Sequence, residues 1–344
     1  MMSNTKANNF IRVSYQEMYD TFNRILMASG FEEQKAAMCA EVFTTNSVEG
    51  IYTHGVNRFA KFIKFVAEGY VKADEEATRV DALGSFERWD GKCGPGPINA
   101  IRCTEAAMAL ASKNTIGCVA LANTNHWMRA GYYGQFAAKK GFALIAWTNT
   151  LGNMPAWGAK DSRLGNNPMV FAVPFASSPI VMDTAMSQYS YGAIDLYKLK
   201  GEKLPTIGGH DKNGELTDDP TLIAETRRVL PIGFWKGAGM SLLLDVMATI
   251  LSAGLATHEI SKLPVEYAMS QVFIAIDLSK LSNASVIYQA ITKIIDDYHQ
   301  SVSTKQNERV RFPGERIEKT RNENLAEGIP VSENVWKEIV TLLA

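Results

Sequence analysis

The sequence predicts an α/β protein whose central mixed sheet packs with a helical domain built from the first and last segments of the chain. Helical periodicity occupies the first 70 residues, short apolar runs typical of buried strands follow, and helical periodicity returns near the end. These three observations predict a helical segment over residues 1–75, an α/β domain over 76–280, and a helical segment over 281–344 that packs with the N-terminal helices.

Three helices are predicted in the N-terminal segment. Ser14 and Glu17 have the spacing of a capping box, and Gly30 ends the helix that follows. The apolar residues of this helix share one face: Tyr15, Met18, Phe22, Ile25 and Leu26. Further helices are predicted over 32–48 and 53–69, so we expect the first 70 residues to be all helical.

The middle of the chain carries the predicted strands, over 117–124, 142–149, 169–174, 180–183 and 271–277. Helices are predicted between and after them, over 98–113, 132–140, 236–253, 284–300 and 332–343. Residues 201–220 are polar and rich in turn residues, which predicts a long loop.

The composition narrows the functional classes. A formal net charge of -1 over 344 residues gives no electrostatic reason to expect nucleic acid or an anionic membrane surface as partner. No apolar run reaches membrane-spanning length, and the start, MMSNTKANNF, has no apolar signal core, so we expect a cytoplasmic protein. The four cysteines form no CxxC pair, which predicts reduced thiols. The sequence also contains no cluster of His, Cys, Asp and Glu with the spacing of metal ligands, so we predict no metal site.

Two glycine-rich stretches do not fit a conventional phosphate-binding loop. GKCGPGPINA at 91–100 has two prolines where a phosphate needs N–H donors. WKGAGMSLLLD at 235–245 lacks the third glycine of GxGxxG and has no strand directly before it. A conventional dinucleotide-binding fold is therefore disfavoured.

The stretch THGVNRF at 53–59 places His54 and Arg58 four residues apart, on one face of a helix for which Thr53 is the expected N-cap. A histidine can pass a proton near neutral pH, and a guanidinium can hold a carboxylate by two hydrogen bonds. The pair therefore suits a 2-oxo acid. A solvated helix face with an incidental histidine is the alternative, and this stretch alone favours it.

Two more stretches follow predicted strands. NTNHWMRAG at 123–131 puts His126 at the carboxyl end of a strand, where ligands gather in α/β proteins, and Trp127 and Arg129 could wall a polar pocket. A buried, hydrogen-bonded loop histidine explains His126 equally well. IVMDTAMS at 180–187 places Asp183 before small side chains that let a ligand approach backbone N–H groups, with a helix N-cap as the alternative.

Lys236 stands in the first turn of a predicted apolar helix, where its charge opposes the helix dipole. A bound cofactor phosphate would resolve that conflict. RVRFPGERIEK at 309–319 predicts a tight turn with Glu315 near a helix start, and on its own it is more simply a surface loop.

The ordered set of motifs resembles one family over nearly the whole chain. THGVNRF, NHWMR, MPxWGAK, GxNP, the strand end at Asp183, WKGxGMS and the PGE turn occur in the order found in the malate/L-lactate dehydrogenase type 2 oxidoreductases. The resemblance implies a non-Rossmann cofactor site in the α/β domain, for NAD (NADH) or alternatively NADP. It implies cofactor contacts at Thr150, Asp183, Thr184, Ala185, Met186, Ser187, Trp235, Lys236, Gly314, Glu315 and Arg316. Arg316 replaces an acid common in close relatives.

The resemblance also implies a reaction and an assembly. We expect reversible hydride transfer between NADH and C2 of a sugar acid, 2,3-dioxo-L-gulonate, in a homodimer with sites near the subunit interface. His54 would supply the proton, Arg58 would hold the C1 carboxylate, and His126 would bond the carbonyl or a neighbouring hydroxyl. Malate, lactate, ureidoglycolate or a cyclic imino acid are the alternative substrates. A sugar-acid or nucleotide-binding protein without catalysis is the alternative from another class.

Overall fold

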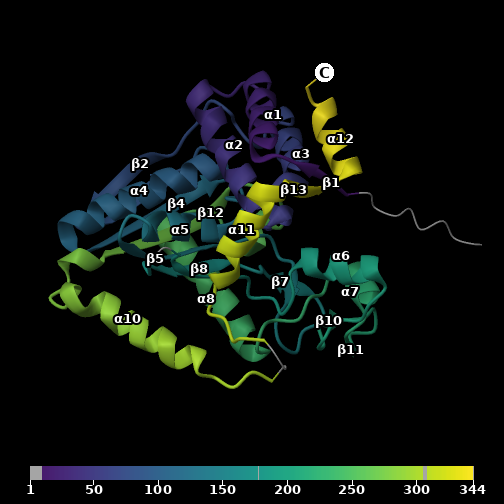
Figure 1. Cartoon of the computed structure of the whole chain (residues 1–344). Helices are drawn as coiled ribbons and strands as arrows, with labels where there is room; N and C mark the ends of the chain where they lie inside the picture. The colour runs from purple at the N-terminus through teal and green to yellow at the C-terminus, as the bar shows by residue number, and fades with distance from the viewer. Residues whose placement is uncertain (1–9, 177, 305–307, 344) are drawn as a thin grey trace, which may run out of the picture.

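A seven-stranded mixed sheet lies at the centre of the computed structural model, which describes residues 10–176, 178–304 and 308–343 (Figure 1). The strands follow the order β2-β3-β4-β12-β5-β8-β9. Their bounds are Thr78–Leu83 (β2), Phe86–Asp90 (β3), Ile116–Thr124 (β4), Phe142–Thr148 (β5), Met169–Val173 (β8), Ile180–Thr184 (β9) and Met269–Asp277 (β12). Strands β3 and β4 run parallel, and the other neighbouring pairs of this sheet run antiparallel. The predicted fold class is confirmed, and this sheet differs from the mostly parallel sheet of doubly wound dinucleotide-binding folds.

Helices cover both faces of the sheet. Helices α4 (Gly96–Asn114) and α5 (Ala130–Ala138) pack on one face, and α8 (Trp235–Ser252) packs on the other. The alternation of side chains along β12 explains this division. Phe273 and Ala275 belong to the core that includes α4 and α5, whereas Val272 and Ile274 pack in the core under α8.

The N-terminal helices form a further layer: α1 (Tyr15–Ala28), α2 (Glu33–Val48), the 3-10 turn η1 (Tyr52–His54) and α3 (Val56–Ala67). The side chain of Ser14 caps α1 as predicted, because it accepts a hydrogen bond from the N–H of Glu17. The rings of Phe22 on α1 and Phe59 on α3 stack 4.0 Å apart, which joins the two helices.

The prediction that the first 70 residues are all helical is wrong at Phe10–Val13. These residues form β1, which pairs antiparallel with β13 (Ile329–Ser332). The partner strand lies at the other end of the chain, so no local pattern reveals the pairing. Residues 1–9, most of the predicted stretch without a signal core, lie outside the described residues.

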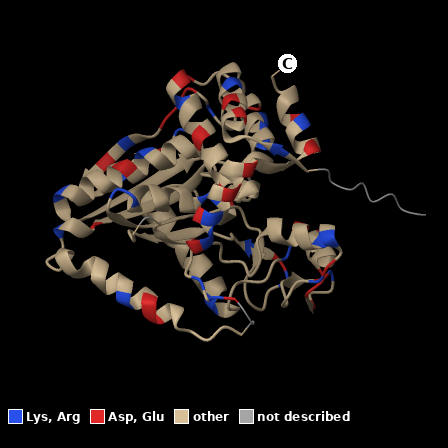
Figure 2. Cartoon of the chain, viewed as in Figure 1, with Lys and Arg blue, Asp and Glu red and all other residues tan. Residues whose placement is uncertain are grey.

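The C-terminal segment is divided between two places. Helix α11 (Glu315–Glu327) contacts α2, and α12 (Glu333–Thr341) contacts α3. Helix α10 (Ala284–His299) instead lies on the far side of the molecule from α1, α2 and α3 (Figure 1). Acidic and basic residues are interspersed along the helices in view (Figure 2), in keeping with the net charge of -1.

A group of short elements lies beside the segment that carries His54. It comprises β6 (Met154–Pro155), β7 (Ser162–Leu164), α6 (Tyr191–Lys200), β10 (Gly209–His210), β11 (Leu216–Thr217), α7 (Pro220–Thr226) and α9 (Thr257–Ile260), whereas the 3-10 turn η2 (Leu278–Lys280) follows β12 and contacts α10. Residues 201–220, predicted as a loop, contain the two-residue strands β10 and β11, which pair as a hairpin. Helix α6 begins against Thr53, so this group borders the site described next.

Candidate active site

His54 lies at the end of the 3-10 turn, and α3 begins two residues later at Val56. The prediction that Thr53 caps the helix is therefore wrong, because the N-cap position is Gly55. Gly55 is needed for packing, since a Cβ atom there would lie 2.2 Å from Oγ of Ser47 on α2. The same serine oxygen accepts a hydrogen bond of 2.8 Å from Val56 N, and Asn46 Nδ2 donates to the carbonyl of His54 at 3.0 Å. Helix α2 thus fixes the backbone on both sides of the histidine.

His126 lies in the loop that follows β4, as predicted. Asn125 anchors this loop, because its Nδ2 donates to the carbonyls of Tyr70 at 3.0 Å and Cys93 at 2.7 Å. The loop also packs against the first residue of α4, where a Cβ on Gly96 would lie 2.2 Å from the carbonyl oxygen of His126. The glycine-rich stretch at 91–100 therefore serves the close approach of α4 to the His126 loop.

The two histidines meet in space. Their rings are nearly parallel, with centroids 5.7 Å apart and an interplanar angle of 14°. Burial, with the guanidinium groups of Arg58 and Arg129, lowers the pKa of His54 to about 4. Burial, followed by the charge of Arg58, lowers the pKa of His126 well below its usual range. Both imidazoles are therefore neutral at neutral pH.

The hydrogen bond at His126 selects one tautomer of the neutral ring. The backbone N–H of Met128 donates to Nδ1 of His126 at 3.0 Å. A nitrogen that accepts a hydrogen bond carries no proton, so Nε2 holds the proton of the neutral ring. His126 thus presents an N–H donor at Nε2. At His54, Nδ1 lies 3.1 Å from the hydroxyl oxygen of Thr53.

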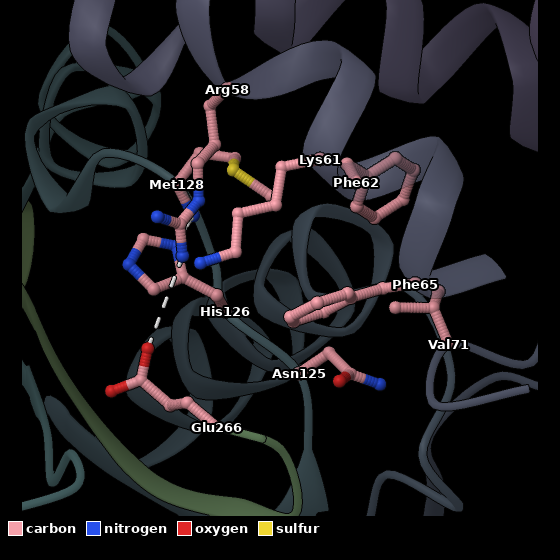
Figure 3. Close-up of a pocket in the computed structure, with 9 residues that line it drawn as sticks. All are labelled: Arg58, Lys61, Phe62, Phe65, Val71, Asn125, His126, Met128 and Glu266. Atoms are coloured by element: carbon pink, nitrogen blue, oxygen red, sulfur yellow. Dashed lines mark hydrogen bonds and ion pairs between the residues drawn. The ribbon is translucent and has the colours of Figure 1, made fainter. Parts of the chain in front are cut away.

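Arg58 shares a pocket with two charged residues that the motifs do not include, Lys61 and Glu266 (Figure 3). The guanidinium of Arg58 lies 4.0 Å from a carboxylate oxygen of Glu266. Burial lowers the pKa of Arg58, and burial followed by the charge of Arg58 lowers the pKa of Lys61. The remaining lining residues are Phe62, Phe65, Val71, Asn125, His126 and Met128. Lys61 is three residues after Arg58, so helical spacing could have found it, whereas Glu266 has no local signal.

The prediction that Trp127 and Arg129 wall a polar pocket is wrong. Trp127 is fully buried beside the rings of Tyr133 and Phe273. Arg129 is also buried, and its guanidinium forms an ion pair with the buried carboxylate of Glu49. The apolar surroundings of the indole and the buried carboxylate explain why both side chains turn inward. Their buried contacts anchor the loop that carries His126.

Asp183 supports the same loop from β9. Its Oδ2 accepts a hydrogen bond of 2.7 Å from the N–H of Gly131, in the first turn of α5, and lies 3.7 Å from Nε of Arg129. Burial raises the pKa of the Asp183 carboxyl, while Arg129 and the Gly131 N–H oppose that shift. A carboxylate at a helix N-terminus also complements the helix dipole.

Most of the predicted cofactor residues lie along β9, in the segment 185–187 that follows it, or in neighbouring segments of the chain beside its two ends. The N–H of Val181 donates to the carbonyl of Pro313 at 3.1 Å, so Gly314, Glu315 and Arg316 lie beside the start of this strand. At the other end, Ser187 pairs with Pro231. This pairing brings Thr184, Ala185 and Met186 near the start of α8, where Trp235 and Lys236 stand in the first turn.

Two of the predicted cofactor residues, Thr150 and Glu315, have side chains that contact other residues of the chain. Thr150 is buried, and its Oγ1 lies 3.2 Å from the side-chain oxygens of Asn166 and Asn167. The carboxylate of Glu315 pairs with Arg309, lies 3.3 Å from Nε2 of His299, and accepts from Phe312 N at 3.0 Å. Glu315 therefore holds the 309–315 turn in shape.

A model of the malate/L-lactate dehydrogenase family matches residues 13–340 of this chain. The chain belongs to the malate/L-lactate dehydrogenase family. It is 41% identical over 334 residues to a 2,3-diketo-L-gulonate reductase from Citrobacter koseri and to one from Escherichia coli, and each match covers 96% of this chain and 100% of the relative.

Solved structures agree with the fold of this dehydrogenase family. A malate dehydrogenase from Entamoeba histolytica superposes with a TM-score of 0.91 at 22% identity, covering 97% of each chain. A sulfolactate dehydrogenase from Methanocaldococcus jannaschii superposes with a TM-score of 0.88 at 24% identity, covering 96% of each chain. The family resemblance predicted from the ordered motifs is confirmed.

Membership of the malate/L-lactate dehydrogenase family makes this chain an oxidoreductase that acts on CH–OH or carbonyl groups and implies a nicotinamide cofactor. Within the ranges that the structure describes, no group of three or more His, Cys, Asp or Glu side chains could hold a metal ion. Over the same ranges, no helix combines the length and hydropathy needed to cross a bilayer.

Proposed function

We propose that this oxidoreductase uses NADH, or alternatively NADPH, to reduce the C2 carbonyl of 2,3-dioxo-L-gulonate to 3-dehydro-L-gulonate. The observation that carries the proposal is that His126 lines one pocket with the guanidinium of Arg58, while the ring of His54 lies nearly parallel to that of His126, 5.7 Å away. Relatives named 2,3-diketo-L-gulonate reductase, 41% identical over nearly the whole chain, support the choice of substrate.

Arg58 is suited to hold the C1 carboxylate. Its side chain is 27% exposed, so it is largely desolvated yet open on one side. A guanidinium in such a setting binds a carboxylate through two parallel, charge-assisted hydrogen bonds. Its present partner, Glu266, is at 4.0 Å, which leaves donors available for a ligand.

The two imidazoles are suited to handle the carbonyl oxygen. When bound, a reduced nicotinamide supplies a hydride to the carbonyl carbon. His54 gives a proton to the oxygen as it becomes an alkoxide, and His126 donates a hydrogen bond from Nε2 to the carbonyl oxygen or to a neighbouring hydroxyl. A carboxylate on Arg58 cancels one of the charges that lower the pKa of His54, so substrate binding favours the protonated ring.

The residues along β9 fit a dinucleotide. Lys236 is exposed in the first turn of α8, and among the described residues no carboxylate forms an ion pair with it. A cation at a helix N-terminus is unfavourable alone, and a phosphate there is stabilised by both the charge and the N–H groups. A cavity of about 210 Å³ beside Gly314 offers further room, and its charged lining residues are Lys139, Arg321, Glu49 and Glu318. We assign cofactor contacts to Thr150, Asp183–Ser187, Trp235, Lys236, Gly314, Glu315 and Arg316.

A second copy of the chain is the proposed partner of α8. The outward face of this helix is apolar beyond Lys236, with exposures of 47% for Met240, 60% for Leu243 and 64% for Ile250. Asp245 turns inward, where its Oδ1 accepts from Asn149 and Thr257. An apolar stripe of this kind on one helix suits a self-complementary dimer interface.

We place the enzyme in the cytoplasm. Cys39, Cys93, Cys103 and Cys118 are free thiols in the structure, and Cys39 and Cys103 are buried. Unpaired cysteines in this number suit a reducing compartment.

The proposal is tested by following reduced-nicotinamide absorbance after adding 2,3-dioxo-L-gulonate, oxaloacetate or pyruvate, with NADH and NADPH in parallel. We expect the highest kcat/KM with 2,3-dioxo-L-gulonate. A higher value with oxaloacetate or pyruvate would reassign the substrate to the malate or lactate type. Thermal stabilisation by NADH without turnover of any carbonyl acid would indicate a binding protein.

A further inference from the structure

The charges that line the substrate pocket add up to one positive charge. Arg58 and Lys61 supply two cations, and among the lining residues the only acid is Glu266, in a region that the structure describes throughout. Figure 3 shows the ends of Arg58 and Lys61 turned toward His126, with Glu266 reaching in from the opposite side. A pocket with this balance is neutralised by a ligand that carries a single negative charge.

Glu266 is held in place from behind. Its side chain is 16% exposed, and its Oε1 accepts a hydrogen bond of 3.3 Å from the N–H of Leu151. Its Oε2 is the oxygen that lies 4.0 Å from the guanidinium of Arg58. Moving the carboxylate out of the pocket would leave the Leu151 N–H without its partner, which carries a cost. We therefore expect the carboxylate of Glu266 to keep its position in the pocket when a ligand binds.

A fixed carboxylate in a half-buried pocket discriminates between acids. One carboxylate of the ligand can sit on Arg58, but a second one would share the pocket with Glu266 and leave excess negative charge. Hydroxyl groups have the opposite effect, because a carboxylate is a strong acceptor for them. A site that hydrogen-bonds a hydroxyl strongly disfavours an analogue that lacks it.

We propose that Glu266 sets the substrate class of this enzyme, by accepting hydrogen bonds from the hydroxyl groups of a 2-oxo monocarboxylate and by repelling dicarboxylates. This inference rests on the proposed function, since it gives a role in substrate selection to a residue that lines the proposed substrate pocket. It separates the sugar acid from oxaloacetate, which also carries a 2-oxo carboxylate. Lys61 supports the role by offsetting the charge of Glu266 when Arg58 is occupied by the substrate.

The test compares the wild type with Glu266→Gln. The kcat/KM for oxaloacetate, divided by that for 2,3-dioxo-L-gulonate, should rise by roughly 10- to 100-fold in the variant. Glu68→Gln is the matched control, because Glu68 follows the last turn of α3 and its exposed carboxylate pairs with Lys64 outside the pocket. Its ratio should equal that of the wild type. An equal fall of both kcat/KM values in Glu266→Gln would overturn the inference, because it would mean that Glu266 only holds Arg58 in place.

A binding measurement keeps the inference testable if turnover is lost. Isothermal titration calorimetry with oxamate, a monoanion, and tartronate, a dianion, gives two dissociation constants for each protein. Their ratio should shift toward tartronate by about tenfold or more in Glu266→Gln. An unchanged ratio would overturn the inference. Failure of the wild type to turn over 2,3-dioxo-L-gulonate would refute the proposed function instead. The ratio of the two dissociation constants would still show whether Glu266 disfavours dianions.

Discussion

The imidazole rings of His54 and His126 lie nearly parallel, 5.7 Å apart, although one stands in a turn before α3 and the other in the loop after β4. Each of these backbone segments is fixed by a buried hydrogen-bonding side chain, Asn46 for the first and Asn125 for the second. The ring pair is therefore a product of tertiary packing, and it puts two imidazoles near the guanidinium of Arg58. Burial, followed by the charge of that guanidinium, lowers the pKa of both rings.

The two histidines should differ in their contribution to turnover. His54→Asn should lower kcat by ~10²–10⁴-fold, because it removes the proposed proton donor, and should leave the dissociation constant for NADH unchanged. His126→Asn removes a hydrogen-bond donor and should lower kcat by a smaller factor. Steady-state kinetics with a fluorescence titration of NADH would measure both. His258→Asn, at an exposed position on α9, is the matched control. A larger loss in His126→Asn would exchange the two roles.

Arg58→Lys should raise KM for the carbonyl acid by roughly 10- to 100-fold, because an ammonium keeps the charge and loses the paired donors. The measurement is KM at saturating NADH. Arg163→Lys is the control, since Arg163 is exposed and pairs with Asp161 away from the pocket. An unchanged KM in Arg58→Lys would remove this residue from the carboxylate site.

His54 should make the stability of the protein depend on pH. Its pKa of about 4 in the folded chain lies below its ordinary value of 6.5. Below pH 6.5 the unfolded chain therefore binds protons that the folded chain excludes, and the free energy of unfolding falls as pH drops from 6.5 toward 4. Urea unfolding at pH 7 and pH 5 should show a smaller loss for His54→Asn than for the wild type. Equal losses in the two proteins would contradict the burial of a neutral His54.

The sequence predicts the elements with strong local signals and misses those that depend on distant partners. The core strands β4, β5, β8, β9 and β12 carry apolar runs, and the structure has each of them. Strand β2 is exposed along its whole length, so its polar sequence TRVDAL lacks such a run, and β1 depends on a partner at the other end of the chain. The site follows the same rule. His54, Arg58 and His126 stand in recognisable motifs, whereas Glu266 reaches Arg58 only through the fold.

Lys236→Gln should weaken the binding of NADH and also stabilise the free protein. Removing a cation from the first turn of α8 relieves its conflict with the helix dipole, worth ~0.3–1 kcal/mol. Loss of a charge-assisted contact to a phosphate should raise the dissociation constant for NADH by roughly 10- to 100-fold. Urea unfolding and a fluorescence titration would measure the two effects. Lys262→Gln, an exposed lysine after α9, is the control. Unchanged NADH binding in Lys236→Gln would remove this residue from the cofactor site.

Leu243→Glu should dissociate the proposed dimer. Leu243 is 60% exposed on the apolar face of α8, so in one chain alone a charge there costs little. Across a self-complementary interface, the same substitution would bury one unpaired charge from each chain, which is strongly unfavourable. Sedimentation velocity should give the wild type twice the 37.9 kDa mass of the chain and give the variant a single chain mass. Leu222→Glu, an exposed leucine on α7, should sediment like the wild type. A wild type that sediments as one chain at micromolar concentration would refute the dimer, and a variant that remains dimeric would move the interface to another face.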